Sequence, residues 1–436
     1  MNLGKNLLKK IIVAIIRFEA KLVLRKYKPK IVGITGSVGK TGTKEAVARV
    51  LGRKFKVRKS QKSFNHDLGI PLTILGCNNA WWNPLAWLKN ILEGASLILF
   101  HAPYPEWLVL EVGVEQPGDI DWVTAWIRFD VVVMTRLPEI PVHVEYFRTP
   151  EQLIKEKLKL PQSVSTEGII VLNHDDPKIM AAKDSFKGRI LTYGWREGAT
   201  VRASNEHLLY HELTGRKLPD GVAFKIDYNG NNVPFRLRNI LAFHQIYGVL
   251  AAIAVGTALE INLVDMVDAL ENLEPSPGRF HLLAGIKDTV IIDDTYNASP
   301  VAVESALNTL SQIETGGRKI AVLGDMMELG PLAIEAHRQV GVLAAPAADI
   351  IFTVGLRMKF AEEELNQKHF AKTKMFHFDN WRGVGEKLQQ ILKTGDVVLV
   401  KGSQSMRLEK VVEEVMAFPE DKASLLVRQE PEWQKR

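Results

Sequence analysis

The sequence predicts an α/β protein with two doubly wound domains, and three observations support this fold class. Short apolar runs rich in β-branched residues alternate with polar or helical segments along most of the chain. A glycine-rich stretch, ITGSVGKTGTKE at residues 34–45, directly follows the first of these runs. The 436 residues exceed what one core usually organises, so two or three domains are expected.

The composition is that of an ordinary folded chain. Hydrophobic residues make up 46% and charged residues 24%, so neither disorder nor a coiled coil is needed to explain the sequence. The net charge of +6 lies largely in the first thirty residues, which favours contact with an anionic surface over a nucleic-acid groove. The single cysteine, Cys77, excludes an internal disulfide and fits a reducing cytoplasm.

Residues 1–29 predict one amphipathic basic helix. Apolar residues recur at helical spacing from Leu3 to Leu22, with lysines and arginines between them. The unbroken apolar run at residues 11–16 is too short to span a bilayer, and the charges that follow it argue against a cleaved secretory signal. Either the apolar face packs on the next domain, or the helix lies in the plane of a membrane surface.

Residues 30–277 predict a central domain with a phosphate loop (P-loop) and a doubly wound sheet. Buried parallel strands are expected at 31–35, 108–112, 131–135 and 168–172. Between residues 200 and 239 the alternation has period two and contains the turn pair Asn229-Gly230, which predicts a small antiparallel meander. A helix at residues 244–259 follows it.

Residues 278–436 predict a second, Rossmann-like α/β domain. It follows the hinge signal ENLEPSPGRF at residues 271–280. Further strands are predicted in the runs TVIIDD, KIAVLGD, IIFTVG and DVVLVKG. The domain is expected to end near Phe418, with a loose charged tail after it.

The glycine-rich stretch has the composition of a loop that binds the phosphates of ATP. It lies between a predicted strand and a predicted helix, so its main-chain N–H groups would face an anion at the helix N-terminus. Lys40 would reach the terminal phosphates and the hydroxyl of Thr41 would hold Mg²⁺. The alternative is a structural turn, because Ile34 occupies the first glycine position of the strict pattern. The predicted loop comprises Gly36, Ser37, Val38, Gly39, Lys40 and Thr41.

Several further motifs occur in a fixed order from about Lys30 to Met416. They read TGSVGKTGTKE, NHDLGIPLTIL, LEVGVEQPGDI, IIDDTYNASP, VLGDMMELG and LVKGSQSMRLE. Together they resemble the Mur ligase family, and within it the MurF branch. The usual member of this family begins with a separate domain that holds UDP, whereas only a basic helix precedes the phosphate loop here, so we expect this chain to lack that domain.

The resemblance implies an ATP-dependent, ADP-forming ligase. A peptide carboxylate attacks the γ-phosphate to give an acyl phosphate, and an amine then displaces phosphate. The implied substrates are a UDP-linked muropeptide, UDP-MurNAc-tripeptide, and D-Ala-D-Ala, joined in peptidoglycan synthesis with ATP and Mg²⁺. Two alternatives remain open, namely a related ligase acting on a different carboxylate and a non-catalytic nucleotide-binding scaffold.

The resemblance also implies a set of metal and catalytic residues. Glu111, at the end of a predicted strand, matches the family's metal-binding glutamate. His143 resembles the histidine near a second metal. Lys157 matches the lysine that carries a CO₂-derived carbamate, although Lys155, Lys157 and Lys159 together would ordinarily indicate a solvated helix face.

Further residues of the same motifs are implied to contact ATP and the two other substrates. From the second domain, Arg279, Asp294, Tyr296 and Asn297 resemble residues that reach across to ATP. Substrate binding is implied for Asn65, Asp67, Lys401, Ser403 and Arg407. The aromatic insert with Trp81, Trp82 and Trp87 is compatible with core packing, an interface or a membrane-facing patch.

Overall fold

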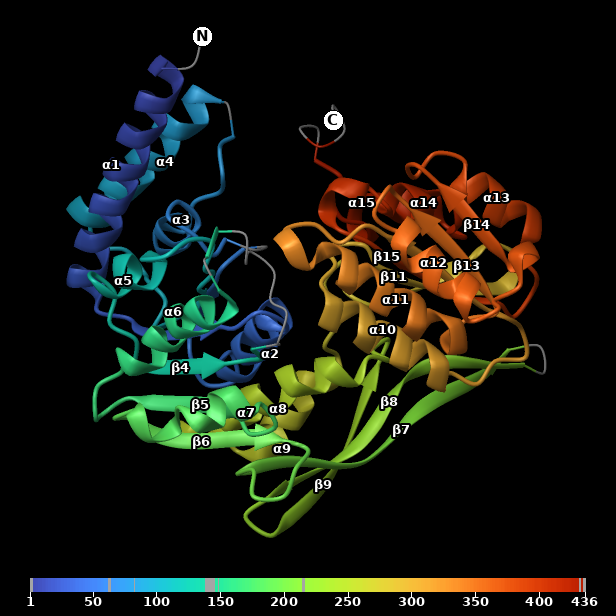
Figure 1. The fold of residues 1–436 in the computed structure, drawn as a ribbon. Helices are drawn as coiled ribbons and strands as arrows, with labels where there is room; N and C mark the ends of the chain where they lie inside the picture. The colour runs from blue at the N-terminus through green and yellow to red at the C-terminus, as the bar shows by residue number, and fades with distance from the viewer. Residues whose placement is uncertain are drawn as a thin grey trace.

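The computed structural model describes residues 3–61, 64–81, 83–137, 146–147, 149–213, 216–430 and 433. Within these ranges the chain forms two β-sheets, each covered by helices on both faces (Figure 1). The predicted fold class, two α/β domains preceded by a helix, is confirmed.

The first sheet contains nine strands in the described chain, in the order β2-β3-β1-β4-β5-β6-β7-β8-β9. Strands β1 to β6 are parallel, β7 joins β6 in parallel, and β8 and β9 continue antiparallel. The strands are β1 (Lys30–Thr35), β2 (Val57–Lys59), β3 (Trp107–Glu111), β4 (Val131–Met134), β5 (Ile169–Asn173), β6 (Arg189–Gly194), β7 (Val201–Leu213), β8 (Arg216–Tyr228) and β9 (Asn231–Arg238).

The central strands β1, β3, β4 and β5 are buried on both faces because their residues are almost all apolar. Successive residues point to opposite faces, so Val32 and Ile34 enter one cluster while Ile31 enters the other. The first face is covered by α2 (Lys40–Leu51), α8 (Phe243–Ala258) and α9 (Leu263–Glu271). The second face is covered by α1 (Leu3–Tyr27), α3 (Gly69–Leu75), α4 (Pro84–Leu99), α5 (Asp119–Thr124), α6 (Pro150–Gln162) and α7 (Pro177–Ala181).

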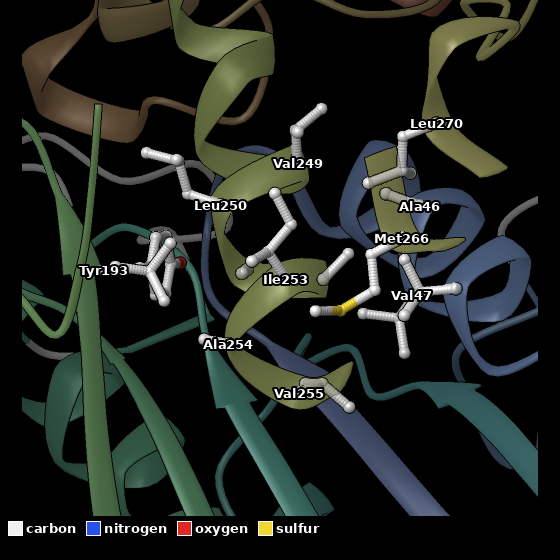
Figure 2. Packing of buried hydrophobic residues seen from close by; sticks show 14 of the residues in the cluster. Ala46, Val47, Tyr193, Val249, Leu250, Ile253, Ala254, Val255, Met266 and Leu270 are labelled. Carbon is white, nitrogen blue, oxygen red and sulfur yellow. The ribbon is translucent and has the colours of Figure 1, made fainter. Parts of the chain in front are cut away.

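Helix α8 forms the centre of the first core. Residues 248–256 of this helix are all buried, which explains its nearly uniform apolar sequence. Figure 2 shows Leu250, Ile253 and Ala254 packed between Tyr193 of β6 and the helices α2 and α9. The Tyr193 hydroxyl donates to the Met134 carbonyl at 2.9 Å, so the one polar atom of this buried ring is bonded.

Helix α1 confirms the predicted N-terminal helix and packs one face on the domain. Ile16, Ala20 and Val23 are fully buried against α3 and α4. The opposite side of α1 remains exposed.

The second sheet has the order β10-β11-β15-β12-β13-β14 for the part of the chain that is described, with β10 antiparallel to the rest. Its strands are β10 (His281–Gly285), β11 (Thr289–Asp294), β12 (Lys319–Gly324), β13 (Ile350–Val354), β14 (Met375–Phe378) and β15 (Val397–Lys401). Its helices are α10 (Pro300–Gln312), α11 (Ala333–Ala347), α12 (Lys359–Gln367), α13 (Val384–Ile391), α14 (Glu409–Val415) and α15 (Lys422–Leu425).

The antiparallel meander is confirmed and also joins the two domains. Strands β7 and β8 extend from the first sheet to the second domain (Figure 1). Leu208 and Leu218 pack against the second domain's core, and the Tyr210 hydroxyl accepts the Glu314 N–H at 2.9 Å. The first sheet therefore contributes directly to the core of the second domain.

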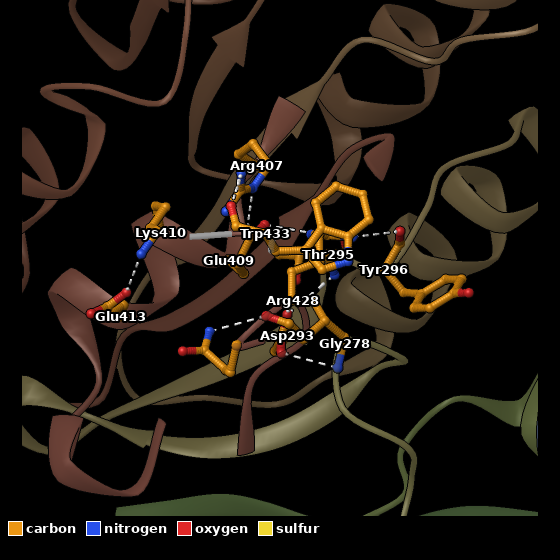
Figure 3. Close-up of polar contacts among 12 residues, drawn as sticks. Gly278, Asp293, Thr295, Tyr296, Arg407, Glu409, Lys410, Glu413, Arg428 and Trp433 are labelled. Carbon is orange, nitrogen blue, oxygen red and sulfur yellow. Dashed lines mark hydrogen bonds and ion pairs between the residues drawn. The ribbon is translucent and has the colours of Figure 1, made fainter. Parts of the chain in front are cut away.

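The expectation of a loose tail after Phe418 is wrong for residues 419–430. Leu426 and Arg428 are buried there. The Arg428 guanidinium donates to the Glu409 carboxylate at 2.8 Å and to the Thr295 carbonyl at 2.6 Å (Figure 3). The segment docks because a buried carboxylate and free loop carbonyls provide partners for its arginine.

Candidate active site

The predicted phosphate loop lies at a topological switch point of the first sheet, where the strand order reverses. Strand β1 pairs with β3 on one side and with β4 on the other, so the consecutive strands β3 and β4 lie on opposite sides of it. Ligands of open α/β sheets bind outside the carboxyl ends of strands at such a point. Residues 36–39 and Glu111 occupy this edge, at the ends of β1 and β3.

The loop adopts a backbone that its glycines permit. Gly36 has φ 138° and Gly39 has φ 87°, values that side-chain-bearing residues rarely adopt. A Cβ on Gly36 would lie 2.0 Å from the Thr135 hydroxyl oxygen. Helix α2 begins directly after Gly39 at Lys40, so its unpaired N–H groups open at the loop, as predicted.

Two lysines converge on this loop. The side-chain nitrogens of Lys40 and Lys157 both donate to the Gly36 carbonyl, at 2.9 and 3.4 Å. Burial lowers the pKa of Lys40, opposed by the nearby Glu111 carboxylate. Burial holds the pKa of Lys157 well below its usual range, and the positive charge of Lys40 lowers it further. The Lys40 ammonium group and the N–H groups at the start of α2 make the loop an electropositive site suited to an anion.

A carboxylate and a hydroxyl lie beside these lysines. The Thr41 hydroxyl donates to Glu111 Oε2 at 3.0 Å, and the Asn65 amide donates to Glu111 Oε1 at 3.3 Å. Thr41 and Glu111 are buried. Their oxygen atoms are the donors Mg²⁺ prefers, and Mg²⁺ usually takes one or two carboxylates while phosphates and water complete its shell. Among the residues described, no group of three or more His, Cys, Asp or Glu side chains could hold a metal.

A cavity of about 370 Å³ joins the loop to the second domain. From the first domain it is lined by the loop and by Asn65, Glu111 and Lys157. From the second domain it is lined by Arg279, Tyr296 and Asn297, among others. Most predicted site residues thus meet in one polar cavity, although the predictions come from segments far apart in sequence.

Arg279 is held at the edge of the cavity by two contacts. Its guanidinium carbon lies 4.0 Å from the centre of the Tyr296 ring, a cation–π contact. Its carbonyl accepts the Gln245 amide at 2.7 Å. Tyr296 in turn donates its backbone N–H to the Gly278 carbonyl at 2.9 Å, so the hinge and the site loop are bonded to each other.

Asp294 and Lys401 form a buried pair behind the cavity wall. The Lys401 ammonium donates to Asp294 Oδ2 at 2.6 Å and to the Asn297 carbonyl at 3.1 Å. Neither Asp294 nor Lys401 lines the cavity. Both instead fix the backbone on which Asn297 lies.

Three of the remaining predicted residues, Ser403, Arg407 and Asp67, lie outside the cavity lining. The Ser403 hydroxyl is buried and accepts the Met327 N–H at 2.9 Å. Arg407 pairs with Glu409 at 2.6 Å and stacks on Trp433 (Figure 3). Asp67 is exposed and absent from the lining. His143 lies outside the described residues. All four assignments stay predictions.

Sequence reasoning missed several residues of the site. His66, Ser299, Glu115, Glu328 and Gln404 line the cavity as well. His66 pairs with Glu115 at 2.9 Å, and its position between Asn65 and Asp67 in the NHDLG motif was the available signal. Lys44 is fully buried beside Glu45 at 3.4 Å, yet one more lysine in a helix gives no sequence signal.

A phosphate loop that faces a second α/β domain across a polar cavity is typical of a two-domain nucleotide-binding protein. Two domain models match the chain and together span more than half of it: the Mur ligase middle domain over residues 89–256 and the Mur ligase glutamate ligase domain over residues 278–404. The chain belongs to the Mur ligase family.

Individual relatives agree with this family. The UDP-N-acetylmuramoyl-tripeptide--D-alanyl-D-alanine ligase of Bacillus subtilis is 28% identical over 403 residues, which cover 92% of this chain and 79% of the relative. Its Escherichia coli namesake is 25% identical over 90% of this chain and 78% of the relative. The structure of a MurF ligase from Thermotoga maritima in complex with ADP superposes with a TM-score of 0.73 at 24% identity, covering 92% of this chain and 83% of that one.

Proposed function

We propose that this chain is an ATP-dependent, ADP-forming ligase that adds D-Ala-D-Ala to UDP-MurNAc-tripeptide in peptidoglycan synthesis. The names of the Bacillus subtilis and Escherichia coli relatives support this reaction. The ADP complex of the Thermotoga maritima protein supports the nucleotide. The reaction belongs to the cytoplasm, where ATP is supplied.

The observation that carries the proposal is the arrangement of charges around the loop. The side-chain nitrogens of Lys40 and Lys157 share the Gly36 carbonyl, with Lys40 as the cation of the loop, and Glu111 lies bonded to Thr41 beside them. A triphosphate and a substrate carboxylate repel each other, so they can meet only where cations screen both. This cavity provides such a place, with Arg279 as a further cation from the opposite domain.

The proposed reaction has two steps, a phosphoryl transfer and then an acyl transfer. A carboxylate oxygen attacks the γ-phosphorus while the bond to the leaving ADP breaks. The incoming amine then attacks the carbonyl carbon, loses a proton, and releases inorganic phosphate. Lys40 and the N–H groups at the start of α2 stabilise the charge on the phosphates, and the wall formed by Tyr296 and Asn297 limits water access to the acyl phosphate.

We assign the Mg²⁺ contacts of the chain to Thr41 and Glu111, because both present buried oxygen atoms beside the loop. The ion would supply positive charge that neutralises the phosphates. Carbamylation of Lys157 is part of the proposal, and its lowered pKa favours the neutral amine that reacts with CO₂.

The decisive experiment mixes the purified protein with ATP, Mg²⁺, UDP-MurNAc-tripeptide and D-Ala-D-Ala. We expect one ADP, one phosphate and a product heavier than the UDP-linked peptide by D-Ala-D-Ala minus one water, as measured by mass spectrometry. Product from another carboxylate in a substrate panel would indicate the related ligase. ATP binding without any turnover on the panel would indicate a scaffold and contradict the proposal.

A further inference from the structure

Two helices of the first domain present an apolar surface to solvent. We call it the α1–α4 face, and it is built from stripes at helical spacing. Leu85 is 76% exposed, Leu99 75% and Phe18 62%, values that a packed face would not have. Trp81 also lies on it, Trp87 is half-buried, and Trp82 falls outside the described residues. The face comprises Ile11, Ile15, Phe18, Trp81, Leu85, Leu88, Leu92, Leu99 and Phe100.

The α1–α4 face is a fixed part of the fold. Helices α1 and α4 lie side by side and extend away from the second domain (Figure 1). The Lys26 ammonium donates to the carbonyls of Leu97, Ile98 and Phe100 at the end of α4, at 3.0, 3.0 and 2.5 Å. These bonds join the carboxyl ends of both helices, so their exposed stripes keep one orientation.

Cations border this face at the base of α1. Lys21, Arg25, Lys28 and Arg128 line a hollow of about 650 Å³ together with Trp126. The one carboxylate there, Asp130, already accepts the Ile31 N–H at 2.8 Å. Positive charge therefore dominates the hollow.

The acidic residue of α1 does not offset this charge. Glu19 is buried, and one of its carboxylate oxygens lies where a Cβ on Gly94 would be, between the two helices. The outward side of α1 thus combines apolar residues with basic ones. This is the pattern of helices that adsorb in the plane of an anionic bilayer.

We propose that the α1–α4 face docks on the surface of an anionic lipid bilayer, with the leucines and Phe18 in the acyl boundary and the basic hollow against phosphate headgroups. Charge complementarity favours this occupant, because anionic headgroups would pair with the four cations and an apolar protein partner would not. In the described residues no helix is both long and apolar enough to cross a bilayer, so docking is in-plane.

The first test measures co-sedimentation of the full chain with vesicles of phosphatidylglycerol and phosphatidylcholine. The Leu85→Asp/Leu92→Asp double variant should bind at least about tenfold more weakly, since two apolar side chains become charged. Leu356→Asp is the matched control, because Leu356 is 68% exposed but lies in the second domain. Equal binding by the double variant and the control would overturn the proposal.

The second test addresses charge. Arg25→Gln/Lys28→Gln should lower the vesicle affinity by roughly fivefold or more per cation removed, and raised salt should weaken wild-type binding. Lys372→Gln/Lys374→Gln removes two exposed cations from the second domain and should leave the affinity unchanged. Equal binding to pure phosphatidylcholine vesicles would contradict the assignment to anionic lipid.

Analytical ultracentrifugation without vesicles tests whether a second copy of the chain, in place of a bilayer, covers the α1–α4 face. A dimer that Leu85→Asp/Leu92→Asp dissociates, with no vesicle binding by the wild type, would overturn the proposal in favour of a second copy. Ligase turnover in solution should not change in any of these variants, since the face lies outside the active-site cavity. The membrane proposal and the ligase proposal therefore fail independently.

Discussion

The active-site cavity and the α1–α4 face reverse the usual distribution of residues in opposite ways. In the cavity, ionisable groups such as Lys157 and Glu111 are buried. On the face, large apolar groups such as Leu85 and Leu99 are exposed. Most of the remaining chain follows the ordinary rule, with apolar strands inside and charged residues outside.

The difference between the two regions indicates what each contacts. A buried charge is tolerated when a partner of opposite charge or a bound ion compensates it. An exposed apolar stripe is tolerated when the environment it meets is itself apolar. Changes in the cavity should therefore cost activity, whereas changes on the face should cost neither activity nor folding.

Replacing Lys40 should have the largest effect. Lys40→Ala removes the ammonium group at the loop, and we expect turnover to fall by about 10³-fold or more, at the upper end of losses for one transition-state donor. Phosphate release measures it. Lys372→Ala, at an exposed position, is the control. Activity retained by Lys40→Ala would remove the loop from the mechanism.

Glu111→Gln should have the next largest effect. The amide keeps a hydrogen bond to Thr41 but loses the negative charge that favours Mg²⁺. We expect turnover to fall about 10²-fold and the Mg²⁺ concentration for half-maximal rate to rise. Glu167→Gln, at an exposed site, should change neither quantity. An unchanged Mg²⁺ requirement would contradict this assignment.

Arg428→Gln tests a buried charge that acts on the cavity from a distance. It leaves Glu409 paired with Arg407 and removes the hydrogen bonds that Arg428 donates to the Thr295 and Tyr296 carbonyls. We expect a loss of about 2–4 kcal/mol in the free energy of unfolding, measured with urea. Arg189→Gln, at an exposed position, should change it by less than about 0.5 kcal/mol. Equal stabilities of the two variants would show that the docked segment contributes nothing.

Glu19 is buried beneath the α1–α4 face, and replacing it should have the smallest effect of these changes. Burial raises the pKa of Glu19 from 4.5 to about 7. Its contribution to stability is therefore complete below pH 4.5 and is lost as the pH rises through about 7. Glu19→Gln should remove this dependence and stabilise the fold at pH 8 by about 1–3 kcal/mol, measured by denaturation at several pH values. Parallel pH profiles of the variant and the wild type would contradict the shift.

The fold was predictable wherever local pattern decided it. The β1–loop–α2 unit and the strands β3, β4, β5, β11, β12, β13 and β15 carry apolar runs that match buried parallel strands. Strands β2, β6, β10 and β14 were not predicted. The residues of β2 and β14 are half-buried or exposed, which gives no clear apolar run. The predicted period-two meander gave no sign that Leu208 and Leu218 would pack in the second domain.

The candidate site was predictable where a motif fixed the residue type. Glu111 meets the loop because the carboxyl ends of β1 and β3 lie side by side, whereas Lys157 comes from within α6 and was implied by the family resemblance. The pair between Arg428 and Glu409 was not predictable, because a charged terminal segment has no local signal for its partner. Similarly, the aromatic insert has no local signal for which of its side chains the fold covers.

The docking of Arg428 sets an order of events during synthesis on the ribosome. Its partners Thr295 and Tyr296 are translated 133 and 132 positions earlier. At a translation rate of about 5–20 residues per second, Arg428 is synthesised roughly 7–27 seconds after the loop that it bonds. A nascent chain can therefore fold its first sheet well before the second wall of the cavity is secured, because that wall receives these bonds only after Arg428 has been synthesised.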